Sequence, residues 1–248
     1  GGGRQQRVKR GRDISVDIEI SFKDSIFGVE RNVILNKTSV CGNCGGNGAD
    51  RGSETITCAM CAGKGKIQEV KRSILGSFAT TKTCDNCHGH GKVPKVKCSV
   101  CRGAGVNKKE TEIKVNIPAS IENGEMLRLN GAGEAVSGGA SGDLYIKIHI
   151  INHTVFKKQG NDLTMDLNVK LTDAILGAEY PIQTLDGEIK VKIPEGVAYG
   201  EILRVRGHGV VISGKRRGDL LIRINITIPK KLSRDAKKTI EELRGEGI

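Results

Sequence analysis

The residues most able to do chemistry in this chain are its eight cysteines, which all lie between Cys41 and Cys101. They form four copies of the pattern Cys-x-x-Cys-x-Gly-x-Gly, whose cysteine pairs are Cys41 and Cys44, Cys58 and Cys61, Cys84 and Cys87, and Cys98 and Cys101. Two thiolates three positions apart can bind one ion, and the glycines let the backbone fold back toward the sulfur atoms. Each copy is therefore half of a tetrahedral site, and four copies predict two Cys₄ sites for two Zn²⁺ ions.

Other uses of these cysteines are possible. An even number of cysteines suits a disulfide framework, but such a scaffold does not need four identical glycine tails, and the N-terminus does not resemble a secretory signal. A redox role would require an attacking thiol of low pKa, and an iron–sulfur cluster is disfavoured by the absence of a Cys-Pro flank. Spacing alone leaves the pairing of the half-sites open, because four halves allow three pairings.

Composition limits the class of protein. The chain has 248 residues, of which 37% are hydrophobic and 3% aromatic, and it lacks tryptophan. This length suffices for two modest domains and a metal module. No run of about 18 apolar residues occurs, so we expect no transmembrane helix, no membrane partner and a cytoplasmic location.

The formal charge of +12 raises the possibility of a nucleic-acid partner. Eight thiolates and two bound Zn²⁺ ions would lower it to +8, and few aromatic residues are available to stack on bases. We therefore expect no nucleic-acid partner. A nucleic-acid-binding zinc protein and a thiol–disulfide oxidoreductase remain the alternative functions.

Alternating apolar and polar residues predict that the chain is mostly β. The predicted strands are residues 13–22, 30–36, 110–117 and 142–150, with a short helical turn at 23–28. A helix is predicted over Leu232–Arg244, with Ser233 as its N-cap and Gly245 as its end. Its apolar stripe could dock on its own domain or on a second copy of the chain, and the sequence does not decide between them.

The two halves of the chain repeat each other. Val115-Asn-Ile-Pro118 matches Val191-Lys-Ile-Pro194, and Gly142-Asp-Leu matches Gly218-Asp-Leu, each with a shift of 76 residues. Asp24-Ser-Ile-Phe-Gly28 matches Asp173-Ala-Ile-Leu-Gly177 with a shift of 149. The difference of 73 residues is an insertion, which places the cysteine module inside the first of two duplicated β domains.

These patterns predict two tandem β-sandwich-like domains with a two-zinc module inserted in the first and a short C-terminal helix. The predicted parts are a glycine-rich basic linker (1–12), a first β domain (13–40 and 107–154), the zinc module (41–106), a second β domain (155–230) and the C-terminal helix (231–248). We expect the linker to be flexible and its basic side chains to be solvated.

The four tandem cysteine motifs and the duplicated β domains resemble the class A J-domain co-chaperones of the DnaJ type. The resemblance implies nested zinc sites, with Cys41, Cys44, Cys98 and Cys101 on one ion and Cys58, Cys61, Cys84 and Cys87 on the other. It also implies a groove for unfolded polypeptide in the first β domain, at Ile14, Val33 and Leu35. Finally, it implies a homodimer contact at the C-terminus, at Leu232, Ile240 and Leu243.

The function implied by the resemblance is that of a stress-response co-chaperone without enzymatic activity. Such a protein binds unfolded polypeptides, prevents their aggregation and delivers them to a seventy-kilodalton heat-shock chaperone. Catalytic motifs such as His-Glu-x-x-His are absent from the sequence, and so is the His-Pro-Asp of the family's J domain. We therefore expect the chain to be the client-handling part of a longer protein.

Overall fold

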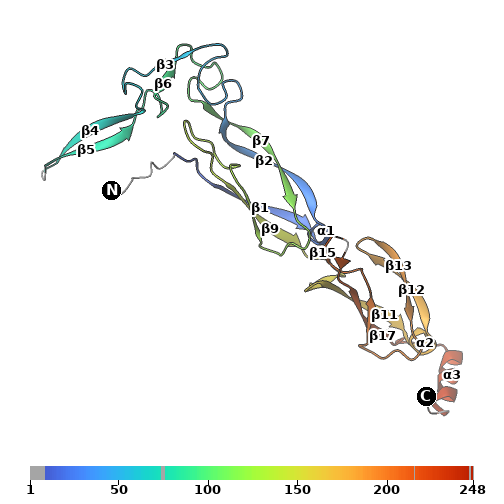
Figure 1. Cartoon of the computed structure of the whole chain (residues 1–248). Coiled ribbons are helices and arrows are strands. Elements are labelled where there is room, and N and C mark those ends of the chain that lie inside the picture. The colour runs from blue at the N-terminus through green and yellow to red at the C-terminus, as the bar shows by residue number, and fades with distance from the viewer. Residues whose placement is uncertain (1–8, 74–75, 215, 246, 248) are drawn as a thin grey trace. The chain divides into compact units, whose positions relative to one another are not determined.

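The computed structural model describes residues 9–73, 76–214, 216–245 and 247, and most of its elements are β-strands (Figure 1). The chain divides into two compact units. The first contains residues up to Ile20, Val29–Ile117 and Glu122–Ile150, and the second contains Ser21–Gly28, Pro118–Ile121 and the residues from Ile151 onward. The prediction of a mostly β protein is confirmed.

The first unit contains a three-stranded sheet of order β1-β9-β8 and a long two-stranded antiparallel sheet formed by β2 and β7. The bounds are β1 (Ile14–Ser21), β2 (Val29–Val40), β7 (Val106–Ile117), β8 (Met126–Leu129) and β9 (Leu144–Ile151). Alternate residues of these strands point inward, as the period of two requires. The buried ones include Ile20, Val115, Ile117, Leu144, Ile146 and Ile148.

The cysteine module begins where the antiparallel β2–β7 ladder ends, and it contains two further strand ladders (Figure 1). The pairing Val40↔Val106 ends the β2–β7 ladder, and Cys41 N–H then donates to the carbonyl oxygen of Gly105 at 3.0 Å. Further along come the β3–β6 ladder and, beyond it, the β4–β5 hairpin. Their bounds are β3 (Thr55–Thr57), β4 (Lys66–Ser73), β5 (Gly76–Thr83) and β6 (Lys92–Pro94).

The second unit contains a four-stranded sheet of order β10-β11-β17-β14, in which β11 and β17 run parallel. Two-stranded ladders β12–β13 and β15–β16 complete its strands. The bounds are β10 (Lys157–Gln159), β11 (Asp162–Lys170), α2 (Leu171–Leu176), β12 (Ala178–Thr184), β13 (Gly187–Ile193), β14 (Ile202–Val205), β15 (Val211–Ser213), β16 (Arg216–Arg217) and β17 (Leu220–Thr227).

Helix α1 (Phe22–Phe27) belongs to the second unit, although the predicted boundaries place its residues in the first β domain. Ser21 caps the helix by accepting a hydrogen bond from Asp24 N–H at 3.0 Å. Ile26 is fully buried in the hydrophobic core of the second unit, and the Arg217 guanidinium lies 5.1 Å from the ring centre of Phe27. The second unit therefore completes its core with a segment from early in the chain.

Matching hydrogen bonds show that the sequence repeat is also a structural repeat. Asp143 N–H donates to the Asp13 carboxylate at 2.7 Å, and the same 2.7 Å bond joins Asp219 N–H to Asp162. Asp143 and Asp219 then each accept a glycine N–H and pair with an arginine, Arg128 or Arg204. These carboxylates fix turns, as their position at the strand starts predicts.

The N-terminal segment before β1 corrects one expectation. Residues 1–8 lie outside the described part of the chain, but residues 9–12 are held by backbone hydrogen bonds to the loop at 134–142. Arg10 also forms a 2.7 Å ion pair with Asp143, whose side chain is almost fully buried. The prediction of a flexible, solvated linker is therefore wrong for residues 9–12, because the loop accepts one backbone hydrogen bond from this segment, donates two to it, and places the buried Asp143 carboxylate beside Arg10.

Helix α3 (Arg234–Gly245) begins after Ser233, whose Oγ accepts a hydrogen bond from Ala236 N–H at 3.1 Å, so the predicted N-cap is confirmed. The helix buries none of its residues, and Leu232, Ile240 and Leu243 are 46%, 45% and 38% exposed. The apolar stripe thus does not dock on its own domain. Within the described part of the chain, no helix has both the length and the hydrophobicity needed to cross a bilayer.

Candidate metal centres

The eight cysteines gather into two groups of four. Centre 1 contains Cys41, Cys44, Cys98 and Cys101, and centre 2 contains Cys58, Cys61, Cys84 and Cys87. The sulfur atoms of each group all lie within 4.8 Å of one another, and all eight side chains are buried. The strand ladders explain this pairing. The β2–β7 ladder brings the first and fourth motifs together, and the β4–β5 and β3–β6 ladders bring the second and third motifs together.

The sulfur–sulfur distances fit a tetrahedral metal ion. Four sulfur–sulfur distances between facing halves are Cys41–Cys98 at 3.9 Å, Cys44–Cys101 at 3.6 Å, Cys58–Cys84 at 3.8 Å and Cys61–Cys87 at 3.6 Å. A tetrahedron with zinc–sulfur bonds of about 2.3 Å has edges of about 3.8 Å. A disulfide bond would measure about 2.05 Å, and all eight cysteines are free. Each group of four cysteines therefore fits one tetrahedral metal ion, and the cysteines do not form a disulfide framework.

Backbone hydrogen bonds link the two halves of each centre reciprocally. In centre 1, Cys41 N–H donates to Gly105 and Cys98 N–H donates to Gly48, at 3.0 and 2.9 Å. In centre 2, Cys58 N–H donates to Gly91 and Cys84 N–H donates to Gly65, at 2.9 and 3.0 Å. Each pair of half-sites is therefore related by an approximate two-fold axis, with the final glycine of one motif against the first cysteine of the other.

The final glycines also donate to sulfur. The N–H groups of Gly65, Gly91 and Gly105 lie 3.2 to 3.3 Å from the sulfur of the cysteine four positions earlier. Such bonds stabilise a thiolate because it accepts but cannot donate. This is the role that the glycine tails of the motif predict.

The electrostatics favour thiolate at the first cysteine of one half in each centre. The Asn43 amide and then the Cys101 N–H lower the pKa of Cys98 to about 6. Burial raises the pKa of Cys58, but hydrogen bonds from Cys61 N–H and the Asn86 amide outweigh it and bring the pKa to about 6. Burial raises the pKa of Cys101 to about 11, so a cation is needed to hold all four sulfurs of centre 1 as thiolates.

Histidines contribute no ligand to either group within the described residues. His88 and His90 lie in the third motif, but both are exposed, and His90 Nε2 lies 3.0 Å from Ser137 Oγ. His149 contacts Asp17 at 3.2 Å, and His153 accepts hydrogen bonds from the N–H groups of Val155 and Phe156. These contacts agree with the interpretation of the histidines as non-ligands.

The three predicted groove residues, Ile14, Val33 and Leu35, are all half-buried. A hollow of about 340 Å³ lies between β1 and β2 and is lined by Ile18, Glu19, Arg31, Asn32 and Val33. Val33 thus lines it, whereas Ile14 and Leu35 do not. Strand β1 is at the edge of its sheet, and β2 pairs only with β7 among the described strands, so each has an edge without a strand partner.

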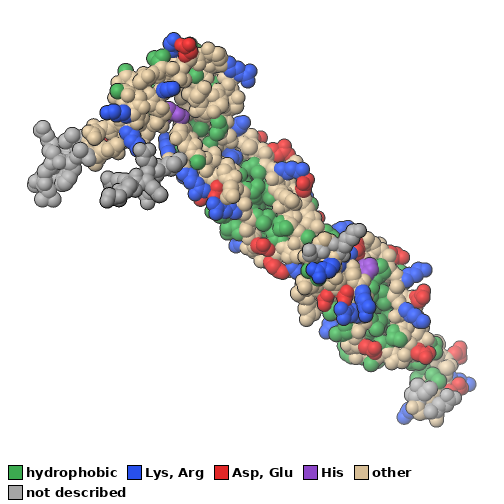
Figure 2. Space-filling view, in the orientation of Figure 1, with side chains coloured by type: hydrophobic (Ala, Val, Ile, Leu, Met, Phe, Trp, Pro, Cys, Tyr) green, Lys and Arg blue, Asp and Glu red, His purple; other side chains and the backbone are tan. Residues whose placement is uncertain are grey.

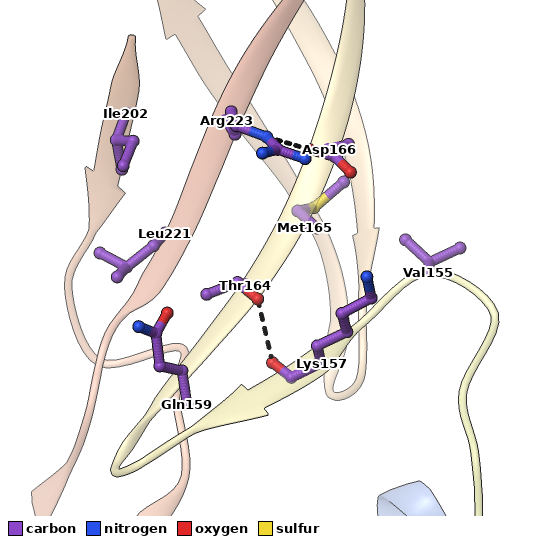
Figure 3. Close-up of a pocket in the computed structure, with 9 residues that line it drawn as sticks. All are labelled: Val155, Lys157, Gln159, Thr164, Met165, Asp166, Ile202, Leu221 and Arg223. Atoms are coloured by element: carbon purple, nitrogen blue, oxygen red, sulfur yellow. Dashed lines mark hydrogen bonds and ion pairs between the residues drawn. The ribbon is translucent and has the colours of Figure 1, made fainter. Parts of the chain in front are cut away.

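A second hollow, of about 280 Å³, lies on the four-stranded sheet of the second unit (Figure 3). Arg223 pairs with Asp166 at 2.6 Å across its floor, and the apolar side chains of Ile202 and Leu221 border it. Figure 2 shows hydrophobic side chains at the surface of the β domains, among charged ones. The sequence did not single out this hollow, because its residues lie on strands far apart in the chain.

The fold and the site together define a class of protein: a duplicated β fold into which a module with two candidate Cys₄ metal centres is inserted. The family model of the DnaJ C-terminal domain matches residues 14–229, so the chain belongs to the DnaJ C-terminal domain family.

Relatives named Chaperone protein DnaJ are similar over almost the whole chain. The one from Acetivibrio thermocellus is 38% identical over 236 residues, which are 94% of this chain and 61% of that protein. The one from Ruminiclostridium cellulolyticum is 40% identical, over 97% of this chain and 65% of that protein, and the one from Clostridium beijerinckii is 36% identical, over 100% and 67%. The chain thus spans about two thirds of the length of the curated relatives it matches.

Proposed function

We propose that this chain is the polypeptide-binding part of a chaperone, with two structural Zn²⁺ ions in centres 1 and 2. The observation that carries the proposal is the pair of buried Cys₄ clusters inserted in a duplicated β fold that belongs to the DnaJ C-terminal domain family. The relatives' name, Chaperone protein DnaJ, supports the role in handling unfolded polypeptides and delivering them to a seventy-kilodalton heat-shock chaperone.

The zinc ions would hold the shape of the module and perform no hydrolysis. Four thiolates fill the four positions of a tetrahedral ion, and a hydrolytic zinc keeps one position open for water. The module also needs the metal for its fold, because its hydrophobic clusters consist of the cysteines themselves with few neighbours such as Ala104, Ile67 and Val93.

Client binding would take place in the first β domain, at the hollow between β1 and β2. An extended polypeptide can pair with an open strand edge through its backbone while its apolar side chains enter neighbouring hollows. Val33 lines the hollow, and Leu35 lies two residues further along β2, on the same face. Backbone pairing does not depend on side-chain identity, which suits a protein that accepts many sequences.

The groove assignment is tested by aggregation assays with a model client that is unfolded by heat or denaturant. Val33→Glu and Leu35→Glu should each reduce suppression of aggregation about tenfold, because a charge in an apolar contact costs at least the ~1.4 kcal/mol of that factor. Ile34→Glu is the matched control, since Ile34 lies between them on the opposite face and is 67% exposed. Equal activity of all three variants and wild type would show that this strand does not form the client-binding groove.

We also propose that Leu232, Ile240 and Leu243 form a contact between two copies of the chain. The stripe is exposed, and burying it requires a partner surface. Leu243→Glu should shift the molecule from dimer toward monomer in sedimentation analysis, without a change in bound zinc. Glu242→Gln, on the polar side of the same helix, should leave the dimer intact.

A further inference from the structure

The third residue of the Cys-x-x-Cys motif differs between the two halves of each centre. It is asparagine in the first and third motifs, at Asn43 and Asn86, but hydrophobic in the second and fourth, at Met60 and Val100. Centre 1 joins the first and fourth motifs, and centre 2 joins the second and third. Each centre therefore combines one asparagine half with one hydrophobic half.

Both asparagines reach across to the facing half. Asn43 Nδ2 lies 3.3 Å from the sulfur of Cys98, and Asn86 Nδ2 lies 3.4 Å from the sulfur of Cys58. In each case the acceptor is the first cysteine of the other motif. A metal-bound thiolate only accepts hydrogen bonds, so the amide must present its NH₂ group to it. The second hydrogen of Asn43 has its own acceptor, because Asp50 Oδ1 lies 3.3 Å from the same nitrogen.

The hydrophobic halves offer no such donor. The two-fold relation of the backbone bonds places Met60 and Val100 where the asparagines stand in the other halves, and their side chains are 59% and 55% exposed. Neither side chain can donate a hydrogen bond. The asymmetry occurs in both centres: the asparagine belongs to the earlier motif in centre 1 and to the later motif in centre 2.

We propose that Asn43 and Asn86 are positioning residues for the two metal ions, each tying the two halves of its centre together through a hydrogen bond to a thiolate. This inference rests on the proposed occupation of both centres by Zn²⁺. The bond orients the sulfur toward the ion and withdraws charge from it, and it resists separation of the two motifs. Loss of such a partner of a metal ligand typically lowers metal affinity about 10- to 100-fold.

The test is a competition titration of the zinc-loaded protein with a chromophoric chelator. Asn43→Ala should release one of the two ions at a 10- to 100-fold lower chelator concentration, and Asn86→Ala should do the same for the other ion. Val100→Ala and Met60→Ala are the matched controls from the facing halves, and their titrations should follow wild type. Equal titration curves for all four variants and wild type would overturn the inference.

Cobalt substitution separates positioning from simple structural damage. A hydrogen bond lowers the energy of the thiolate electrons, so the sulfur-to-Co²⁺ charge-transfer band should move to lower energy in Asn43→Ala and Asn86→Ala, and stay in place in the controls. Weaker binding with an unchanged band would contradict the proposed hydrogen bond. A wild-type protein that binds neither Zn²⁺ nor Co²⁺ would overturn the proposed function and, with it, this inference.

Discussion

The glycine tails of the cysteine motifs show how single residues determine the metal centres. Gly105 has a φ of +74°, and a Cβ atom there would overlap the carbonyl oxygen of Gly46 in the facing motif. Gly48 has the same relation to Gly103. Both the backbone conformation and the close approach of the two motifs therefore require glycine.

Gly105→Ala should remove the metal ion of centre 1 and leave that of centre 2. Gly42→Ala is the control, because Gly42 does not have positive φ and no atom lies within 4 Å of its added Cβ. Metal analysis should find one ion per chain in Gly105→Ala and two in Gly42→Ala. Two ions in both variants would contradict the reciprocal contact.

Asp143 gives a pH dependence at the scale of one carboxyl group. The N–H of Gly131 is the main cause that lowers its pKa to about 2 from an ordinary 3.8, and Arg128 and Arg10 help to outweigh the opposing effect of burial. Because the pKa is lower in the folded state, this carboxylate stabilises the fold above about pH 4, and the stabilisation is lost as the pH falls toward 2.

Asp143→Asn should therefore unfold at a lower temperature than wild type at pH 6, and the difference should shrink as the pH falls from about 4 to about 2. Thermal unfolding followed by circular dichroism at several pH values measures this difference. A difference that stays constant over the whole pH range would show that the ionised carboxylate is not the stabilising form.

At the scale of elements, the strands were predictable and the partner of α1 was not. Period-two alternation depends only on neighbours in sequence, so strands such as β1 and β7 could be placed to within a few residues. Ile26 and Ile175 occupy the same position in the repeated segments 24–28 and 173–177. Ile26 is nevertheless fully buried, whereas Ile175 is 49% exposed. Burial of a helix face depends on what lies against it, which a repeat in sequence does not specify.

The metal centres, too, were predictable from the sequence only in part. Cysteine and glycine spacing predicts four half-sites, and the resemblance to DnaJ-type proteins supplies the pairing that the structure shows. Motif spacing does not indicate a role for Asn43 and Asn86, because each contacts a cysteine more than 25 positions away. The available signal was their alternation with Met60 and Val100 at one motif position. The sequence predicts a solvated Arg10 because its partner, Asp143, lies 133 positions away.

The N-cap of α1 gives a prediction at this scale. Ser21→Ala removes the acceptor for Asp24 N–H and should lower the free energy of unfolding by about 1 kcal/mol. Denaturant unfolding of the second unit measures the loss. Ser15→Ala, at an exposed position of β1 away from any cap, is the control. An equal effect of the two substitutions would mean that the cap contributes nothing beyond strand propensity.

At the scale of the whole molecule, the module and the β domains should differ in their need for metal. The β domains contain hydrophobic cores, such as that around Ile26, Leu220 and Ile222, whereas the module's clusters are made of cysteines. Chelation should therefore increase amide exchange throughout residues 41–106 and leave exchange in β11 and β17 nearly unchanged. Loss of protection in both regions together would show that the metal supports the whole fold.

The proposed chaperone role rests on the combination of parts, since neither alternative function explains the duplicated β domains. A nucleic-acid-binding protein would use the positive charge, and its affinity would fall steeply with salt. An oxidoreductase would need labile thiols, whereas here all eight are buried. A polypeptide-binding surface would use the open strand edges and exposed apolar side chains of the β domains.

The most direct test is a binding titration of the zinc-loaded protein at near-physiological salt. The probes are a permanently unfolded protein, the same protein in its folded form, and an oligonucleotide. The account predicts selective binding of the unfolded chain, weakened by Val33→Glu and not by Ile34→Glu. Binding of the oligonucleotide alone, with no preference for the unfolded chain, would contradict it and make the positive charge the functional surface.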